Sequence, residues 1–167
     1  MFPLLKFQSV FLVVMFCISM QVHAADDLAD HVVVNKSERK LYLKKGDEVL
    51  REFDIALGLV PAGHKTREGD FKTPEGDYRL TRRRLNSDFF MAIQISYPDR
   101  DDVARARAAG VSPGSNIMIH GQPTVPTKPA SYYRKHDWTD GCIAVSNAAM
   151  VDIWQLTVEN TPITILP

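Results

Sequence analysis

The sequence has no excess of charge of either sign. Its 167 residues include 20 Lys and Arg and 20 Asp and Glu, so the formal net charge at pH 7 is zero. Nucleic-acid binding depends on a clustered basic surface, so we expect no nucleic-acid partner. Hydrophobic residues make up 45% and charged residues 24%. This composition is typical of a folded globular chain, and the length suits one domain.

Long apolar runs are absent except at the start of the chain. Lys6 precedes an apolar run over 10–20 that is too short to span a bilayer, and Val22-His23-Ala24 resembles a cleavage site. We therefore expect a signal peptide at 1–24 and a mature exported domain at 25–167. An uncleaved N-terminal anchor is the alternative. After cleavage we expect no stable membrane span.

Cysteine is scarce. Cys17 lies in the predicted signal peptide, so the mature chain keeps Cys142 alone and has no internal disulfide. A single thiol in an oxidising compartment is a liability unless it is buried or used. The chain also lacks a His-x-x-x-His or Cys-x-x-Cys pair, so we expect neither a metal site nor a cofactor.

Most of the remaining chain has the period-two pattern of strands. The hydrophobic alternation predicts a hairpin over 41–57 with its turn at 45–47, and further strands at 31–35, 78–82, 92–96, 116–120, 143–145 and 163–165. Segment 58–72 and the proline-rich segment 123–129 read as loops. The pattern is that of a mainly β domain.

Two helices complete the prediction. Pro98-Asp99 begins a short helix that Gly110 ends. A longer C-terminal helix begins at Asn147. Its core side consists of residues at helical spacing, namely Met150, Ile153, Trp154 and Val158.

One part of the sequence combines a thiol, a histidine and glycines. His120 ends a predicted strand, and Gly141-Cys142 precedes another. Alternation points both reactive side chains away from the core. A histidine can take a thiol proton, and the backbone N–H groups of Gly141 and Cys142 are candidate oxyanion donors. By itself, the pair also fits a buried structural cysteine and a core histidine.

The pattern resembles the L,D-transpeptidase (YkuD-type) catalytic domain, whose motif is a His-Gly followed downstream by Ser-His-Gly-Cys. Segments 69–78, 97–99 and 113–121 resemble other parts of the family pattern, and 137–147 resembles a Gram-negative branch of it. The resemblance implies a mainly β, sandwich-like fold and a periplasmic location. It makes Cys142 the acylated nucleophile and His120 its general base, with the backbone around Gly141 as the oxyanion hole.

Two residues depart from the family motif. Asp140 replaces the histidine two positions before the cysteine, and Ala144 replaces an arginine two positions after it. A carboxylate beside Cys142 disfavours the thiolate. Orienting His120 and capping the turn before Gly141 are two interpretations of Asp140. The departures also leave open a catalytically silent peptidoglycan-binding module.

The resemblance implies peptidoglycan stem peptides as substrates, attacked at the L-centred carbonyl of diaminopimelate, in cell-wall biogenesis and cell shape. The outcome is either cross-linking or hydrolysis of cross-links or lipoprotein–peptidoglycan bonds. A peptidoglycan-linked outer-membrane lipoprotein is therefore a candidate partner, and the branch favours cleavage. Trp138, His136, Gly121 and Arg134 are candidate substrate contacts. Loop anchoring for Trp138, and solvated surface positions for His136 and Arg134, are the structural alternatives.

Overall fold

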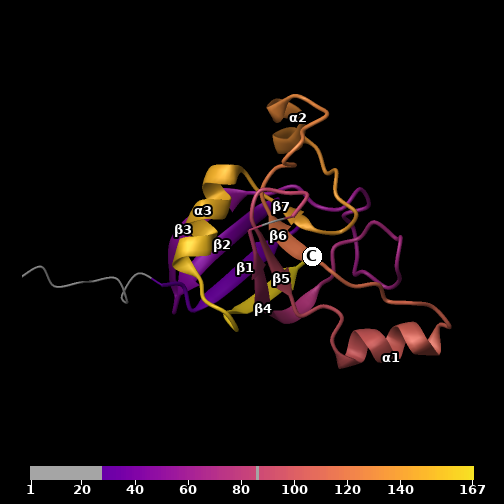
Figure 1. Ribbon diagram of the computed structural model, residues 1–167. Helices are drawn as coiled ribbons and strands as arrows, with labels where there is room; N and C mark the ends of the chain where they lie inside the picture. Colours follow the sequence, from indigo (N-terminus) through magenta and orange to yellow (C-terminus); the bar gives the residue numbers. More distant parts are fainter. Residues whose placement is uncertain (1–27, 86) are drawn as a thin grey trace, which may run out of the picture.

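The structure is a computed structural model that describes residues 28–85 and 87–167. The predicted signal peptide at 1–24 lies outside the described residues. The strands are β1 His31–Asn35, β2 Lys40–Lys45, β3 Glu48–Asp54, β4 Gly76–Arg84, β5 Ala92–Ile95, β6 Met118–His120, β7 Ile143–Ala144 and β8 Pro162–Leu166. The helices are α1 Arg100–Ala108, α2 Ala130–Lys135 and α3 Asn147–Leu156 (Figure 1).

The strands form one mixed sheet in the order β3-β2-β1-β8-β4-β5-β6-β7. The β1–β8 and β6–β7 pairs are parallel, and the other pairs are antiparallel. Just after β3, Ala56 reaches the opposite edge and exchanges two backbone hydrogen bonds of 2.8 Å with Ala144 of β7. The sheet therefore curls until its two edges meet, which leaves neither edge open at this point. The predicted mainly β, sandwich-like domain is realised as this curled sheet.

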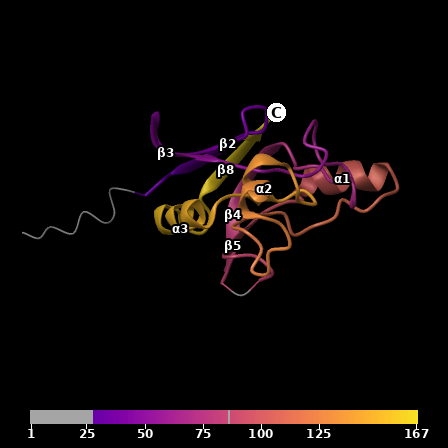
Figure 2. The ribbon, with the colours of Figure 1, turned by 90° about the horizontal axis from the view of Figure 1, so that it is seen from above.

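The core lies inside the curl. Alternate residues of β1, β2 and β8 are buried, as period two requires when only one face of a sheet meets the core. Helix α3 covers this core with Ala149, Met150 and Ile153 (Figures 1 and 2). Its N-cap Ser146 accepts a hydrogen bond from the Ala149 N–H at 3.1 Å. The helix therefore starts immediately after the strand that follows Cys142.

The predicted hairpin, the strands, the two loops and the two helices are confirmed, with changes at their ends. Val158 was wrongly placed on the C-terminal helix. That helix ends at Leu156 because Thr157 is extended and its hydroxyl bonds to the Ile153 carbonyl. Val158 lies beyond this end and is 49% exposed. Helix α2 was not predicted, since it is only six residues long and follows a proline-rich loop.

Helix α1 begins with a capping box. The Asp99 carboxylate accepts from the Asp102 N–H at 2.7 Å, and the Asp102 carboxylate accepts from the Asp99 N–H at 3.1 Å. In the described part of the chain, no helix combines the length and apolar character that crossing a bilayer requires. Helix α1 lies away from the sheet (Figure 1). Its Asp102 side chain connects this helix to the loop described below.

Candidate active site

The turn before Cys142 is held by the side chains of its own motif. Asp137 accepts from the Arg39 guanidinium and from the Leu57 N–H at 2.8 Å. The buried Thr139 hydroxyl donates to the Cys142 carbonyl at 2.7 Å and accepts from the Gly141 N–H at 3.1 Å. These bonds tie the turn before Cys142 to the residues that flank the β2–β3 hairpin.

Gly141 fills a position that no other residue fits. Its φ is +128°, and a Cβ at this point would lie 2.5 Å from the Lys72 carbonyl oxygen. Such a φ favours glycine, and the close backbone contact requires it. The Gly141 N–H is already bonded to Thr139. The Gly141 N–H was predicted to be an oxyanion donor, but it is not free to act as one. The Cys142 N–H is the remaining member of the predicted pair.

His120 is fully buried at the end of β6. Its Nδ1 lies 2.8 Å from the Gly121 carbonyl oxygen. A carbonyl only accepts, so Nδ1 carries the proton and Nε2 is the nitrogen with the lone pair. Nε2 is buried and has no hydrogen-bond partner in the described part of the chain. Since buried polar atoms are nearly always paired, this nitrogen is a functional candidate.

Two aromatic rings enclose the imidazole. Phe89 stacks on His120 with ring centroids 3.9 Å apart, and Trp138 meets it edge-on at 5.6 Å. The Trp138 indole N–H donates to the Tyr133 carbonyl at 3.2 Å, which fixes its ring. Trp138 thus lies against the histidine, where it anchors the motif loop as well.

The register of β6 and β7 places the thiol and the imidazole on one face. Ile119 pairs with Ile143, and His120 with Ala144, in a parallel ladder. Ile119 and Ile143 are both in the core. Because successive side chains alternate, His120 projects from the opposite face. Cys142 directly precedes β7, and continuing the same alternation puts its side chain on that face too, diagonal to His120.

Burial favours the neutral form of both groups. It raises the pKa of the Cys142 thiol to about 11; the Met118 N–H and Lys65 oppose this rise, and Asp140 adds to it. Burial also lowers the pKa of His120 to about 4, against the hydrogen bond to the Gly121 carbonyl. The thiol itself lies 3.6 Å from the Asn116 carbonyl oxygen and is partly exposed. Burial therefore disfavours a thiolate–imidazolium pair in the free protein.

Asp140 does neither of the two things predicted for it. The Gly121 carbonyl orients His120, and Thr139 caps the turn before Gly141. The Asp140 side chain is exposed. Within residues 28–85 and 87–167, its carboxylate has no hydrogen-bond or ion-pair partner. Its position beside the thiol needs another explanation.

A hollow of about 390 Å³ lies near Cys142, although Cys142 itself does not line it. The hollow is lined by Asn116, Asp140 and residues of the loop 63–75, among them Lys65 and Glu68. The carbonyl oxygen of Asn116 accepts a hydrogen bond from the Cys142 thiol. The Lys65 ammonium lies 2.8 Å from the Asp70 carboxylate, and both side chains are buried. The loop 63–75 is therefore the second wall of the site, and charged pairs build it.

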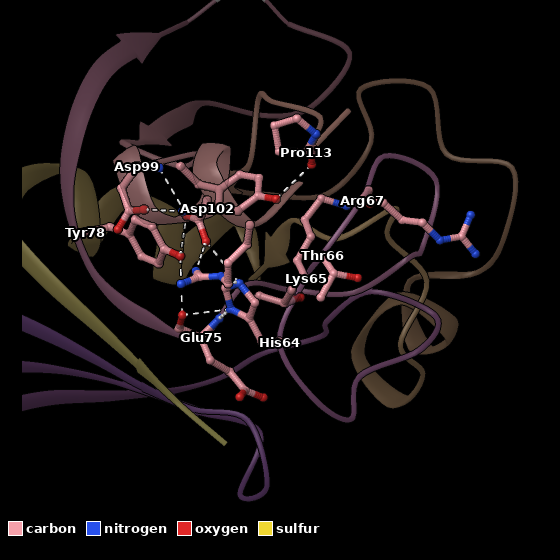
Figure 3. A network of polar contacts seen from close by, with 12 residues as sticks. His64, Lys65, Thr66, Arg67, Glu75, Tyr78, Asp99, Asp102 and Pro113 are labelled. Atoms are coloured by element: carbon pink, nitrogen blue, oxygen red, sulfur yellow. Dashed lines mark hydrogen bonds and ion pairs between the residues drawn. The ribbon is translucent and has the colours of Figure 1, made fainter. Parts of the chain in front are cut away.

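Figure 3 shows how this wall is anchored to α1. The buried Asp102 carboxylate accepts from the Tyr78 hydroxyl at 3.0 Å and from the Asp99 N–H, and lies 3.0 Å from His64 Nε2. His64 Nδ1 accepts from the Glu75 N–H at 3.0 Å. The two ends of the loop are thus tied to each other and to the helix.

The other predicted contact residues lie in different places. Gly121 is buried beside His120, and a Cβ there would lie 2.6 Å from the Phe90 carbonyl oxygen. His136 is exposed at the end of α2 and stacks on Tyr132. Arg134 lines two hollows on the α2 side, one of them with Ala144. His136 and Arg134 therefore have no contact with the thiol or with His120 in the described structure.

Several residues of the site were missed. Phe89, Asn116 and Lys65 are far from the cysteine in sequence, and nothing in their local pattern marks them. Thr139 could have been found, because a hydroxyl two residues before a glycine is a common turn cap. Among the described residues, no three His, Cys, Asp or Glu side chains gather in a way that could hold a metal ion.

Comparisons with known proteins identify the family. Residues 17–165 match the family model of the L,D-transpeptidase catalytic domain. The chain belongs to this family. YafK of Escherichia coli K12 is 32% identical over 131 residues, which are 75% of this chain and 46% of YafK.

Solved structures agree with this assignment. The helical cell shape determining protein Pgp2 of Campylobacter jejuni is 26% identical with a TM-score of 0.59, over 81% of this chain and 46% of Pgp2. An L,D-transpeptidase of Mycobacterium smegmatis is 13% identical with a TM-score of 0.54, over 82% of this chain and 58% of the other, and supports the fold alone. The L,D-transpeptidase domain described here thus spans about half the length of YafK and Pgp2.

Proposed function

We propose that this L,D-transpeptidase-family chain is an exported cysteine acyl transferase or amidase of the periplasm. Its substrates are peptidoglycan stem peptides, attacked at the L-centred carbonyl of diaminopimelate. The products are either new cross-links or the fragments of hydrolysed cross-links or lipoprotein–peptidoglycan bonds. The family assignment supports peptidoglycan as the substrate class.

The first half of the reaction acylates the enzyme. His120 Nε2 takes the thiol proton of Cys142 while the sulfur attacks the amide carbonyl. The Cys142 N–H donates to the oxyanion that forms. When the C–N bond breaks, the imidazolium gives its proton to the departing amine. A thioester and a free amine result.

The second half releases the acyl group. Water or an amine attacks the thioester, and His120 takes a proton from that acceptor. The sulfur leaves and is reprotonated by the imidazolium. Water gives hydrolysis and an amine gives a cross-link. Both routes use the same groups of the protein.

The observation that carries this proposal is the unpaired Nε2 of His120. It is buried, aromatic rings fix its orientation, and it shares a sheet face with a partly exposed thiol. The high pKa of the thiol and the low pKa of the imidazole support proton transfer during attack, rather than a preformed ion pair. A structural histidine would have both nitrogens paired.

The test is mass spectrometry of a defined muropeptide panel incubated with the wild type and with Cys142→Ala. The panel holds tetrapeptides, 3–3 dimers and lipoprotein-linked fragments. We expect products with the wild type alone. Addition of water would identify an amidase, and joined stems would identify a transpeptidase.

Folded protein that changes no substrate, and whose Cys142 is not acylated by a carbapenem-type probe, would overturn the proposal. Retention on intact sacculi would then support the silent binding module. Circular dichroism of Cys142→Ala serves as the control for folding.

A further inference from the structure

Strand β3 has an unpaired edge that begins where the sheet closes. The Ile55 N–H donates to the Arg39 carbonyl at 3.0 Å, on the β2 side. Backbone groups of successive residues in a strand point to its two sides in turn, so those of Ala56, Asp54 and Glu52 point away from β2. Ala56 uses both of its groups in the pair with β7. On this side, the backbone groups of Asp54 and Glu52 have no backbone partner in the described part of the chain.

The edge stays unpaired because β7 ends where it would continue the ladder. After the antiparallel pair of Ala56 with Ala144, the next residues to face each other would be Asp54 and Ser146. Ser146 is instead the N-cap of α3, and its carbonyl accepts from the Met150 N–H at 2.9 Å. The start of the helix therefore stops the ladder one step beyond the pair.

A hollow of about 270 Å³ lies beside this unpaired edge. Residues 52–56 line one side of it, and residues 144–146 with Gln122 line another. Gln122 donates its side-chain N–H to the Val145 carbonyl at 2.7 Å, whereas its own oxygen Oε1 is buried without a donor among the described residues. The hollow thus has unused donors and acceptors on β3 and an unused acceptor on Gln122. The backbone of an extended peptide supplies the matching groups at the spacing of a strand.

The side chains at this edge are already paired on the face of the sheet. The Lys40 ammonium lies 2.6 Å from the Glu52 carboxylate and 2.8 Å from the Asp54 carboxylate. The edge therefore offers main-chain groups to a ligand. Such groups select an extended backbone rather than a charge.

The hollow is next to the reactive groups along the sheet. Ala144 pairs with His120 in the ladder of β6 and β7. It lies two residues after Cys142, which is about 7 Å along a strand. Ala144 also lines the hollow. A chain bound at the edge of β3 is therefore within a few residues' reach of the thiol.

We propose that the unpaired edge of β3 at Glu52 and Asp54 binds an extended segment of L-polypeptide, carried on the amine side of the amide that Cys142 attacks. This inference rests on the proposed function. An L-peptide in β conformation continues the ladder that Ala56 begins. The acyl side is a stem peptide with D-centres, which favour φ of the opposite sign and interrupt such a ladder. The polypeptide is therefore the leaving group.

Two substrates with the same stem measure this contact. In one, the L-centred carbonyl of diaminopimelate is joined through a glycine to a peptide of L-residues, and in the other to the same peptide of D-residues. We expect kcat/KM to be about tenfold higher or more for the L form, as a few backbone hydrogen bonds of ordinary strength would give. Equal values for the two substrates would overturn the inference and leave the proposed reaction intact.

Asp54→Pro removes one outward N–H from the edge, while the Ile55 bond to β2 needs no group that proline lacks. The preference for the L form should fall to about threefold or less, because a donor is lost and the ring obstructs the added strand. Asp54→Ala is the matched control, since it removes the carboxylate, keeps the N–H and should keep the preference. Loss of the preference in both variants, or in neither, would contradict main-chain pairing at this edge.

Hydrogen exchange in Cys142→Ala measures binding without turnover. The L form should slow exchange of the Glu52 and Asp54 amides, and the D form should leave them unchanged. This result would support the docking edge even in a protein that converts no substrate. Binding of the L form without such protection would overturn the inference. Protection that rises with protein concentration in the absence of peptide would also overturn it, because a second copy of the chain would then occupy the edge.

Discussion

The wall that holds His120 and the wall formed by residues 63–75 are stabilised by different forces. The first is apolar: Phe89 and Trp138 enclose the imidazole, and no described group pairs with its Nε2. The second is charged, with ion pairs between Lys36 and Glu75 and between Lys65 and Asp70, and a third between the buried Asp102 and the exposed Arg105. The thiol lies where the two walls meet.

The difference indicates where a ligand can act. On the charged wall the buried charges satisfy one another, so the wall is a rigid support. Among the described residues, two buried side-chain polar atoms have no partner, Nε2 of His120 and Oε1 of Gln122, and the first of them lies on the apolar wall. The carboxylates of Asp140 and Glu68, on the other side, are exposed. A buried polar atom without a partner is costly, and it persists where function needs it.

The largest effect should come from removing the base. His120→Ala should slow acylation of Cys142 by about 10²- to 10⁴-fold, the usual contribution of a positioned general base. The matched control is His136→Ala, since His136 is exposed at the end of α2, where it stacks on Tyr132 and bonds to its carbonyl oxygen. The rate of thioester formation, followed by intact-protein mass spectrometry, measures both. Equal losses of acylation rate in the two variants would mean that His120 is not the general base.

The charged wall should lose stability when one partner of an ion pair is removed. Lys36 is buried and bonds Glu75 at 2.7 Å and the Thr73 carbonyl at 3.1 Å. Lys36→Met should lower the free energy of unfolding by about 3–5 kcal/mol, because a partly buried carboxylate is left unpaired. Urea denaturation measures this loss, and hydrogen exchange should rise in 63–75.

The double variant Lys36→Met with Glu75→Gln is the control for this pair. It should recover part of the lost stability, because no uncompensated charge remains. An equal loss in the single and double variants would show that packing of the lysine stem, rather than charge, holds the wall.

Acid should affect the two walls in different pH ranges. Burial lowers the pKa of His120 from its ordinary 6.5 to about 4, so the unfolded chain binds a proton that the folded chain refuses. This contribution is fully present above pH 6.5 and is lost as the pH falls toward 4, by about 3 kcal/mol. Asp70 acts below that range: its contribution is present above pH 3.8 and is lost as the pH falls through about 2.

His120→Gln isolates the first range. Its free energy of unfolding should fall less than that of the wild type between pH 6.5 and pH 4, measured by urea titrations at several pH values. Parallel curves for the two proteins would mean that the imidazole is already solvated or charged in the folded state.

The sequence predicts one of these walls much better than the other. Alternation and the His-Gly and Gly-Cys motifs predict β6, β7 and the placement of both reactive groups on one face. The loop at 58–72 was predicted only as a loop. Its pairs join Lys36 to Glu75 and His64 to Asp102, over separations that no local pattern encodes. The two roles predicted for Asp140 were wrong for the same reason. The Gly121 carbonyl orients His120 and Thr139 caps the turn, and both contacts emerge only from the fold.

The smallest predicted effect comes from the stacking of Phe89 on the His120 imidazole. Phe89→Leu should cost about 1 kcal/mol of stability, the value of an aromatic stack beyond its buried area. The pKa of His120 should stay low, because burial lowers it and leucine still excludes water. Phe71→Leu, at an exposed aromatic, is the control for stability. An NMR titration of His120 that returned to about 6.5 in Phe89→Leu would mean that the stack itself, and not dehydration by the wall, keeps the imidazole neutral.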